Sequence, residues 1–183
     1  SVENSNEITD EKGNKLTFEN GKLKKIITAY GEYVNTYNAA GQLLTVTNSV
    51  GKNINLSYNS AGRLSTIKDA NDICTSYFYD SYGNLTQITY HDGSKTKYSY
   101  DSASRLIKVT NQDVSEYVIA YESSGNDRRV TGITEKGKNS AGVMVAGGGI
   151  DIEYQAFSAV IQNKITKMRT VYRFDDIASD WKR

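Results

Sequence analysis

A 21-residue period is the feature of this 183-residue chain that most restricts how it can fold. Three rows of residues keep this step without slippage. The first row is Tyr37, Tyr58, Tyr79, Tyr100 and Tyr121; the second is Gly41, Gly62 and Gly83, followed by Ser104; the third is Leu43, Leu64, Leu85 and Leu106. A repeat of this length is one supersecondary unit that buries its apolar side chains against the neighbouring units.

Each unit predicts two β-strands. In the second half of a unit, bulky residues alternate with polar ones, as in Ile54, Leu56 and Tyr58, and this alternation is typical of a strand with one buried face. The first half predicts the partner strand. There Leu64 and Ile67 are three residues apart, which simple alternation cannot place on one face, so we expect the Leu to lie at the start of this strand, near a bend or a bulge.

The segments between the strands have the composition of turns. "YNSAG" and "YDSYG" begin with Tyr and an Asn or Asp, and place Gly three residues after that Asn or Asp. Asn and Asp bond to their own backbone in turns, and Gly accepts a positive φ. We therefore predict hairpins at 43–58, 64–79, 85–100 and 106–121. The fold class follows as all-β, with consecutive antiparallel hairpins that form an open, curved spiral sheet.

The flanking segments are less regular, but they fit one domain over residues 1–183. Residues 1–36 predict irregular N-terminal units, and 37–121 are the regular repeats. A glycine-rich break is expected at 133–149, within the irregular hairpins of 122–175. Residues 150–162 predict one strand that turns at Gln162 and Asn163 into a second strand, and 176–183 predict a tail.

Charge and composition restrict the partners. The 22 Lys and Arg nearly balance the 21 Asp and Glu, so no nucleic-acid partner is predicted. No apolar run is long enough to span a membrane, which predicts no membrane insertion. The chain contains only one cysteine, Cys74, so it cannot form an internal disulfide.

Residues that could carry chemistry are few. His91 is the only histidine and falls in a predicted turn, and Cys74 falls on the polar face of a predicted strand. Asp80 and Asp101 occupy positions that hold Asn in the two preceding units, and Asn cannot act as a general acid or a nucleophile. The sequence therefore predicts a non-enzymatic protein with no catalytic residues, no metal site and no cofactor.

Binding residues are the open question. The aromatic rings of Tyr58, Tyr79 and Tyr100 can stack on sugar rings, but strand alternation also predicts them to be core residues. Four basic residues near the C-terminus are candidates for binding an acidic polymer, or for a solvated strand face that discourages edge-to-edge aggregation. These are Lys164, Lys167, Arg169 and Arg173.

The segments "YNSAGRL", "YDSYGNL" and "YDSASRL" resemble the YD repeats of bacterial Rhs and wall-associated proteins, and more distantly those of teneurins. The resemblance extends over residues 10–135. It implies a spiral β-sheet that winds into a hollow shell, which in this family encloses the C-terminal part of the chain, in many members a toxin. It also implies a secreted protein, or one on the bacterial cell surface or cell wall. Four regular repeats cannot close such a shell, so we expect a fragment of one.

Two hypotheses follow for the function. The first is a structural segment of an encapsulating or wall-associated shell, whose partner is the remainder of its own chain, meaning further repeats and C-terminal cargo. The second is a module that binds carbohydrate or wall polymer through its Tyr-rich face or its basic strand. In either case, unpaired strands at the two ends of the sheet predict self-association.

Overall fold

The protein is all-β in the computed structural model, which describes residues 5–123 and 129–174. Over these residues it contains sixteen β-strands and no helix, and hence no helix able to cross a membrane. Each strand is a sheet neighbour of the strand that precedes it in the chain. This order confirms the predicted succession of antiparallel hairpins.

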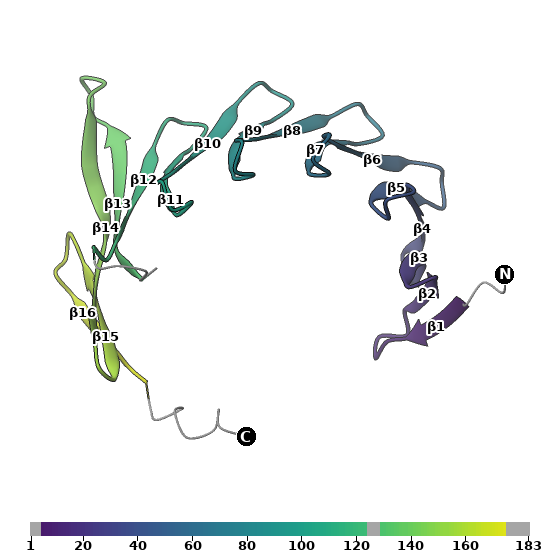
Figure 1. Cartoon of the computed structure of the whole chain (residues 1–183), viewed down its shortest axis with the longest axis horizontal. Coiled ribbons are helices and arrows are strands. Elements are labelled where there is room, and N and C mark those ends of the chain that lie inside the picture. The colour runs from purple at the N-terminus through teal and green to yellow at the C-terminus, as the bar shows by residue number, and fades with distance from the viewer. Residues whose placement is uncertain (1–4, 124–128, 175–183) are drawn as a thin grey trace. The chain divides into compact units, whose positions relative to one another are not determined.

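The chain divides into two compact units, one comprising Ser1–Phe78 and Thr89–Gly93, the other Tyr79–Ile88 and Ser94–Arg183. In the first unit the strands follow in chain order (Figure 1). They are β1 (Ser5–Thr9), β2 (Lys15–Glu19), β3 (Lys22–Thr28), β4 (Gly31–Tyr37), β5 (Leu43–Asn48), β6 (Asn53–Tyr58), β7 (Leu64–Lys68) and β8 (Cys74–Tyr79). The last residue of β8, Tyr79, belongs to the second unit.

The second unit has the same chain-order arrangement. Its strands are β9 (Leu85–Thr89), β10 (Lys95–Tyr100), β11 (Leu106–Thr110), β12 (Glu116–Tyr121), β13 (Val130–Lys138), β14 (Met144–Gln155), β15 (Ser158–Asn163) and β16 (Arg169–Arg173). The last residue of β9, Thr89, belongs to the first unit. The four predicted hairpins are present with the predicted limits, as the pairs β5–β6, β7–β8, β9–β10 and β11–β12.

A β-bulge marks the start of the first strand of a unit, as the Leu spacing predicts. Tyr58 lies opposite Leu64, whereas the preceding residue, Ser57, lies opposite Thr66, so Ser65 is the extra residue. The bulge shifts the alternation by one position, and Leu64 thereby joins the face that its neighbour three residues later occupies. The same register shift occurs at Phe18, Tyr37, Tyr100 and Tyr121.

A single type of five-residue turn connects most of the described strands. In the turn at Asn59, the amide of Gly62 donates to the Asn59 carbonyl at 2.9 Å, and the Asn59 amide donates to the Arg63 carbonyl at 2.8 Å. The fourth residue has a positive φ, 75° at Gly62, as expected for a type I turn followed by a left-handed residue. The same bonds recur in the turns that begin at Asp10, Asn38, Asn48, Asp69, Asp80, Asp101, Asn111 and Asn139.

The glycine-rich break predicted at 133–149 is wrong, because most of these residues lie within strands β13 and β14. The two strands pair with a register shift between Thr134 and Lys136. A Cβ added at Gly149 would lie 2.0 Å from the Ile133 carbonyl oxygen, and φ there is 128°. Glycine is therefore needed for a close approach of two strands at a bulge, a role that composition does not distinguish from a loop.

The single strand predicted for 150–162 is also wrong, because this segment contains the end of β14 and most of β15. Gln155 pairs directly with Ser158, so only Ala156 and Phe157 form the turn. Neither residue is a common turn former, which is why the pattern gives no sign of this hairpin. A turn follows the predicted residues rather than including both. Gln162 and Asn163 are the last residues of β15, and the turn begins at Asn163, whose carbonyl accepts the Lys167 amide at 3.0 Å. The predicted tail, 176–183, lies outside the described residues.

Few side chains of this sheet are fully buried. The most buried described hydrophobic residues are Ala159 and Val160, which are 6% and 5% exposed. The chain exposes 13074 Å², whereas a compact protein of 20.3 kDa exposes roughly 8,800 Å². Within each unit the described strands form a single layer, so stability comes from contacts along the sheet rather than from a second layer.

The strain at the left-handed turn position can be tested by substitution. Val114 occupies this position in the turn that begins at Asn111, with a φ of 63°. Because a β-branched residue is strained there, Val114→Gly should raise the free energy of unfolding by about 0.5–1 kcal/mol. The matched control is Gly51→Val, which should lower it by a comparable or larger amount, since φ is 78° and no atom lies within 4 Å of the added Cβ. Denaturant unfolding measures both; a stability gain in the control would contradict the strain argument.

Candidate functional site

The repeated tyrosine closes three of the four regular hairpins, β5–β6, β9–β10 and β11–β12, through its hydroxyl group. Tyr58 Oη donates to the carbonyl oxygen of Leu43 at 2.8 Å, and Tyr100 Oη donates to that of Leu85 at 2.9 Å. In the first case, the tyrosine is the last residue of its hairpin and the leucine is the first. The backbone pairing of β5 with β6 begins only at Thr45. The Tyr58 hydroxyl therefore supplies a hydrogen bond to the Leu43 carbonyl, which lies outside the paired residues of the two strands. Tyr121 bonds to Leu106 in the same way at 2.9 Å.

The first irregular unit contains a variant of this bond. Tyr37 Oη donates to the Leu23 carbonyl at 2.7 Å, and Asn35 Nδ2 donates to the same oxygen at 2.9 Å. Asn35 is 7% exposed and lies opposite Val46, in the row where the regular units have an apolar residue. Sequence reasoning missed Asn35; the only signal is that a polar residue interrupts an apolar row two positions before the tyrosine.

The residue after the tyrosine builds the turn. Asp80 Oδ1 accepts the backbone amides of Tyr82 at 3.0 Å and Asn84 at 2.8 Å. Asn59 Oδ1 accepts the corresponding amides of Ala61 and Arg63 at 3.0 and 2.9 Å. An amide oxygen and a carboxylate oxygen thus perform the same function at equivalent positions. The turn-forming role expected for Asp80 and Asp101 follows from these bonds.

These bonds shift the acid–base behaviour of the two aspartates. The side-chain hydrogen bond from Asn84 is the main cause that lowers the pKa of Asp80 below its usual value. For Asp101, the backbone hydrogen bond from Arg105 is the largest cause and the Arg105 side chain the second, and again the pKa is lowered. Arg105 Nε lies 2.6 Å from Asp101 Oδ2. Donors that favour the charged form keep both carboxyl groups ionised at neutral pH, where they hold no proton to donate.

Side chains also connect one turn to the next. Gln42 Nε2 donates to the carbonyl of Gly62 at 2.7 Å, and Asn84 Nδ2 lies 3.2 Å from Ser104 Oγ. Both donors follow the left-handed residue of their own turn, and both reach the left-handed residue of a turn about one repeat later. Sequence reasoning missed this position, although a polar residue occurs there in every regular unit.

The rows of Tyr, Gly and Leu that are expected to be structural lie at the strand ends and in the turns of these hairpins. Gly41, Gly62 and Gly83 have positive φ, as does Ser104. The three tyrosines considered for ligand binding, Tyr58, Tyr79 and Tyr100, are half-buried. Burial is the first cause that raises the pKa of Tyr100.

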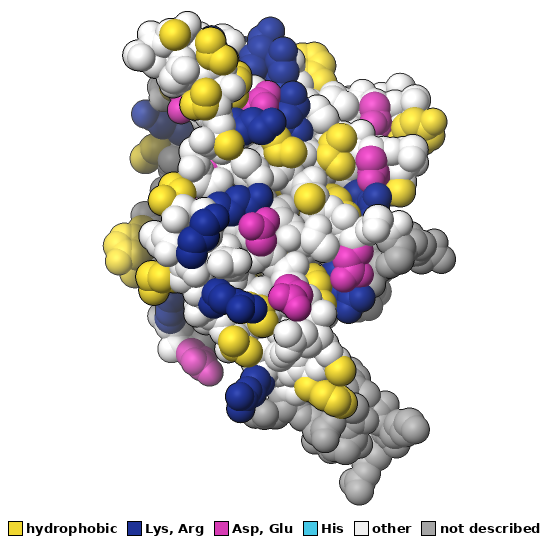
Figure 2. All heavy atoms as spheres, turned by 90° about the vertical axis from the view of Figure 1, so that its left-hand side faces the viewer, with side chains coloured by type: hydrophobic (Ala, Val, Ile, Leu, Met, Phe, Trp, Pro, Cys, Tyr) yellow, Lys and Arg dark blue, Asp and Glu magenta, His cyan; other side chains and the backbone are white. Residues whose placement is uncertain are grey.

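The basic residues expected near the C-terminus are not gathered into one patch. Lys164 Nζ lies 3.1 Å from Asp151 and bonds to Thr134 Oγ1 at 2.7 Å. Arg169 lies 3.8 Å from Glu153. Lys167 belongs to the turn before β16, and Arg173 is an exposed residue at its end. On the side of the molecule shown in Figure 2, basic and acidic side chains are interspersed.

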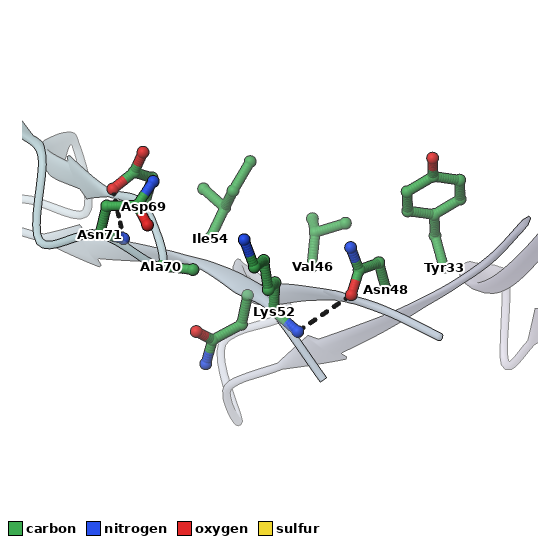
Figure 3. A pocket seen from close by; sticks show the side chains of 9 residues that line it. Tyr33, Val46, Asn48, Lys52, Ile54, Asp69, Ala70 and Asn71 are labelled. Atoms are coloured by element: carbon green, nitrogen blue, oxygen red, sulfur yellow. Dashed lines mark hydrogen bonds between the residues drawn. The ribbon is translucent and has the colours of Figure 1, made fainter. Parts of the chain in front are cut away.

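One hollow is present on the apolar face of the first unit, with a volume of about 220 Å³. Tyr33, Val46 and Ile54 line it together with two turns, as Figure 3 shows. The oxygen of Asn48 that borders this hollow accepts the Lys52 amide at 2.9 Å. Asp69 Oδ1 likewise accepts the Asn71 amide at 2.8 Å. The polar atoms at the rim thus serve the turns.

Residues of possible catalytic use are dispersed. His91 is exposed in a turn. Cys74 Sγ lies 4.0 Å from Ser76 Oγ. Cys74 pairs across the strands with Lys68 of β7, so the two side chains lie on the same face of the sheet. Among the residues that the structure describes, no three His, Cys, Asp or Glu side chains are placed to hold a metal ion. The hydrogen bonds described above build hairpins and turns.

The recurrent tyrosine, Asx and left-handed residues define a hairpin-repeat protein. Residues 2–137 match the family Teneurin YD-shell. The chain belongs to this family, which confirms the resemblance to YD repeats. No curated protein matches the chain.

Solved structures share the fold. They include TcdB2-TccC3 with Cdc42, at 17% identity and a TM-score of 0.61, and TcdB2-TccC3 without its hypervariable C-terminal region, at 18% and 0.63. A third is the Tc holotoxin pore of Photorhabdus luminescens, at 18% and 0.60. Each match covers 87% of this chain and 10% of the other. The chain therefore spans about a tenth of the length of these proteins.

The tyrosine bond can be tested within one strand. Tyr100→Phe removes the donor to the Leu85 carbonyl and should lower the free energy of unfolding by about 1 kcal/mol. Tyr100→Ala also removes the ring and should cost about 2–3 kcal/mol. The control is Lys97→Ala, an exposed residue of the same strand, with an expected cost below about 0.5 kcal/mol. Equal costs for Tyr100→Ala and Lys97→Ala in denaturant unfolding would contradict the role of the tyrosine.

The aspartate turns predict a dependence of stability on pH. Because the folded-state pKa values of Asp80 and Asp101 are lowered, their contribution is present above the unfolded pKa, near 3.8, and is lost as the pH falls through the folded values. Asp80→Asn combined with Asp101→Asn should reduce the loss of stability between pH 7 and pH 3, since the amides keep the turn bonds.

Denaturant midpoints at the two pH values measure this difference. The control replaces an exposed carboxylate inside a turn, Glu11→Gln, and keeps the first turn residue unchanged. A double variant that loses as much stability on acidification as the unmodified chain would show that these two carboxylates do not contribute to the acid sensitivity.

Proposed function

We propose that this chain is a non-enzymatic segment of a shell wall in a secreted or surface protein. Its partner is the remainder of its own chain, including further repeats and an enclosed C-terminal part. The observation that carries the proposal is the repeated tyrosine-to-leucine bond, which closes three of the four regular hairpins as building units within a single-layered sheet. Membership of the Teneurin YD-shell family supports it.

A wall is the use that suits a layer of this kind. Backbone groups are satisfied along the sheet by antiparallel pairing and at the edges of the repeats by turn bonds. Hairpins that contact only their neighbours can be added in any number, so a sheet can extend as far as an enclosure requires. Large hydrophobic residues such as Ile54 and Phe78 remain partly exposed on the described strands, which supports further contacts in a longer protein.

Carbohydrate recognition has less support. Stacking on a sugar requires accessible ring faces, and the tyrosine rows are half-buried. The hydroxyls of Tyr58 and Tyr100 already donate to backbone carbonyls. Arg169 and Lys164 have acidic partners, which reduces the net charge available to an anionic polymer. The structural role therefore remains the proposal.

The test uses the complete natural reading frame that contains this sequence. If the repeats wall off another part of the same chain, limited proteolysis should spare that part in the unmodified protein. Tyr58→Ala combined with Tyr100→Ala should make it cleavable by loosening the wall, whereas Lys97→Ala should not. Equal cleavage in the unmodified protein and in the tyrosine variant would refute enclosure. Specific binding of the unmodified protein to a wall glycan would favour the recognition module.

A further inference from the structure

A hollow of about 340 Å³ lies within the second unit, over strands β12, β13 and β14 (Figure 1). Small-molecule sites have volumes of roughly 300–1,000 Å³. Tyr117 and Glu135 line the hollow and are direct cross-strand partners, so their side chains share one face, with Cβ atoms roughly 5 Å apart. Val109, the other cross-strand partner of Tyr117, places them on the apolar face. Gly137 and Gly147 line the hollow with bare backbone.

Glu135 is the charged side chain on the face that the hollow occupies. Two further charged residues border the hollow, Glu116 and Lys136. They are cross-strand partners of each other, and each is adjacent in sequence to Tyr117 or Glu135. Strand alternation therefore directs their side chains to the opposite face. There Lys108 lies 3.0 Å from Glu116.

Glycines determine where the Glu135 carboxylate lies. The register of β13 and β14 shifts between Thr134 and Lys136, so Glu135 has no direct partner in β14. A Cβ added at Gly148 would lie 3.2 Å from Glu135 Oε2, whereas a Cβ added at Gly137 would meet no atom within 4 Å. The carboxylate thus lies over the bare backbone of the bulge, and the space above Gly137 is open.

Neither Glu135 nor Tyr117 uses its side chain to hold the described part of the chain together. Among the described residues, neither side chain has a hydrogen bond, an ion pair or a ring contact. Tyr117 is 40% exposed, and Glu135 is also exposed. Asn35, a polar residue in an apolar row of the first unit, is by contrast buried and donates to the Leu23 carbonyl. Glu135 therefore lacks the structural role that accounts for Asn35.

Elsewhere in the second unit, an arginine joins a tyrosine ring to a carboxylate. Arg105 Cζ lies 4.9 Å from the ring centre of Tyr121, and Arg105 Nε lies 2.6 Å from Asp101 Oδ2. A planar guanidinium group can make both contacts at once, because its face stacks on the ring while the N–H groups at its edge donate to the carboxylate. A second example is Arg129, which lies 5.0 Å from the Tyr154 ring centre and 2.8 Å from Glu122.

We propose that the hollow beside Tyr117 and Glu135 binds the arginine side chain of a polypeptide segment, which supplies from outside the guanidinium group that the other two sites take from their own unit. An arginine fits better than a lysine, since a guanidinium group offers a flat face and paired donors. This inference does not rest on the proposed enclosing role.

The surroundings suit a peptide more than a free amino acid. Ile165 is 67% exposed, and its Cδ1 lies 3.5 Å from the position of a Cβ at Gly148, next to the Glu135 carboxylate. This apolar surface is available to the residues that flank the bound arginine. The α-carboxylate of free arginine would instead approach Glu135, and like charges repel.

The experiment is an NMR titration of the isotope-labelled 183-residue chain with the blocked peptide acetyl-Gly-Arg-Gly-amide, in low salt. The amides of Gly137 and Gly147 should shift with a dissociation constant in the millimolar range, about 1–10 mM, because exposed ion pairs and exposed cation–π contacts are weak. The peptide with citrulline in place of arginine has nearly the same shape without the charge and should cause no such shifts. The lysine peptide should bind about three- to tenfold more weakly.

Variants locate the site. Glu135→Gln and Tyr117→Leu should each weaken arginine-peptide binding about threefold or more, and Gly137→Arg should abolish it by filling the hollow from within. The control is Glu153→Gln, which removes a carboxylate from the opposite face of the same unit and should leave binding unchanged. The amide spectrum of each variant verifies that the sheet is intact.

Several outcomes would overturn the proposal. They are an absence of binding, equal binding of the arginine and citrulline peptides, a lysine peptide that binds as tightly as the arginine peptide, and shifts confined to residues away from the hollow. Unchanged affinity in Glu135→Gln, Tyr117→Leu or Gly137→Arg would also overturn it.

Discussion

The constraint on which this structure depends is that the described strands, which form a single layer within each unit, must keep their side chains in register. A slip of one residue would move every apolar side chain to the opposite face. Two devices prevent this slip in each regular unit. The five-residue turn fixes which residues face each other, and the bulge at the Tyr–Leu pair resets the alternation once per repeat. The tyrosine hydroxyl then bonds to a carbonyl that lies beyond the paired residues.

This arrangement explains why the repeat tolerates some substitutions and not others. Asn and Asp exchange at the first turn position because the turn uses only an oxygen acceptor. Gly can be replaced at the fourth turn position, as Asp72, Ser104 and Val114 show, at the cost of backbone strain. Tyr is retained in all the regular units, since no other side chain combines a ring for the apolar face with a hydroxyl that reaches the leucine carbonyl.

The repeat made the hairpins at residues 43–121 predictable, because three rows in one register determine strand, turn and bulge together. Gly149 was misread because a glycine needed for close strand approach has the same composition signal as a glycine in a loop. The turn at Ala156 and Phe157 has no turn-forming residue and was missed. Asn35 and Gln42 were missed because their partners, the Leu23 and Gly62 carbonyls, lie on other strands and turns. Such bonds depend on three-dimensional proximity that spacing alone does not provide.

The chain order of the strands has a mechanical consequence. Because each strand pairs with the strand before it, the contacts that hold a hairpin are made within a short length of sequence. A pulling force applied at one end would meet these contacts one hairpin at a time rather than all at once. Such a sheet can be unravelled in small steps and can reform in small steps, since local contacts form quickly.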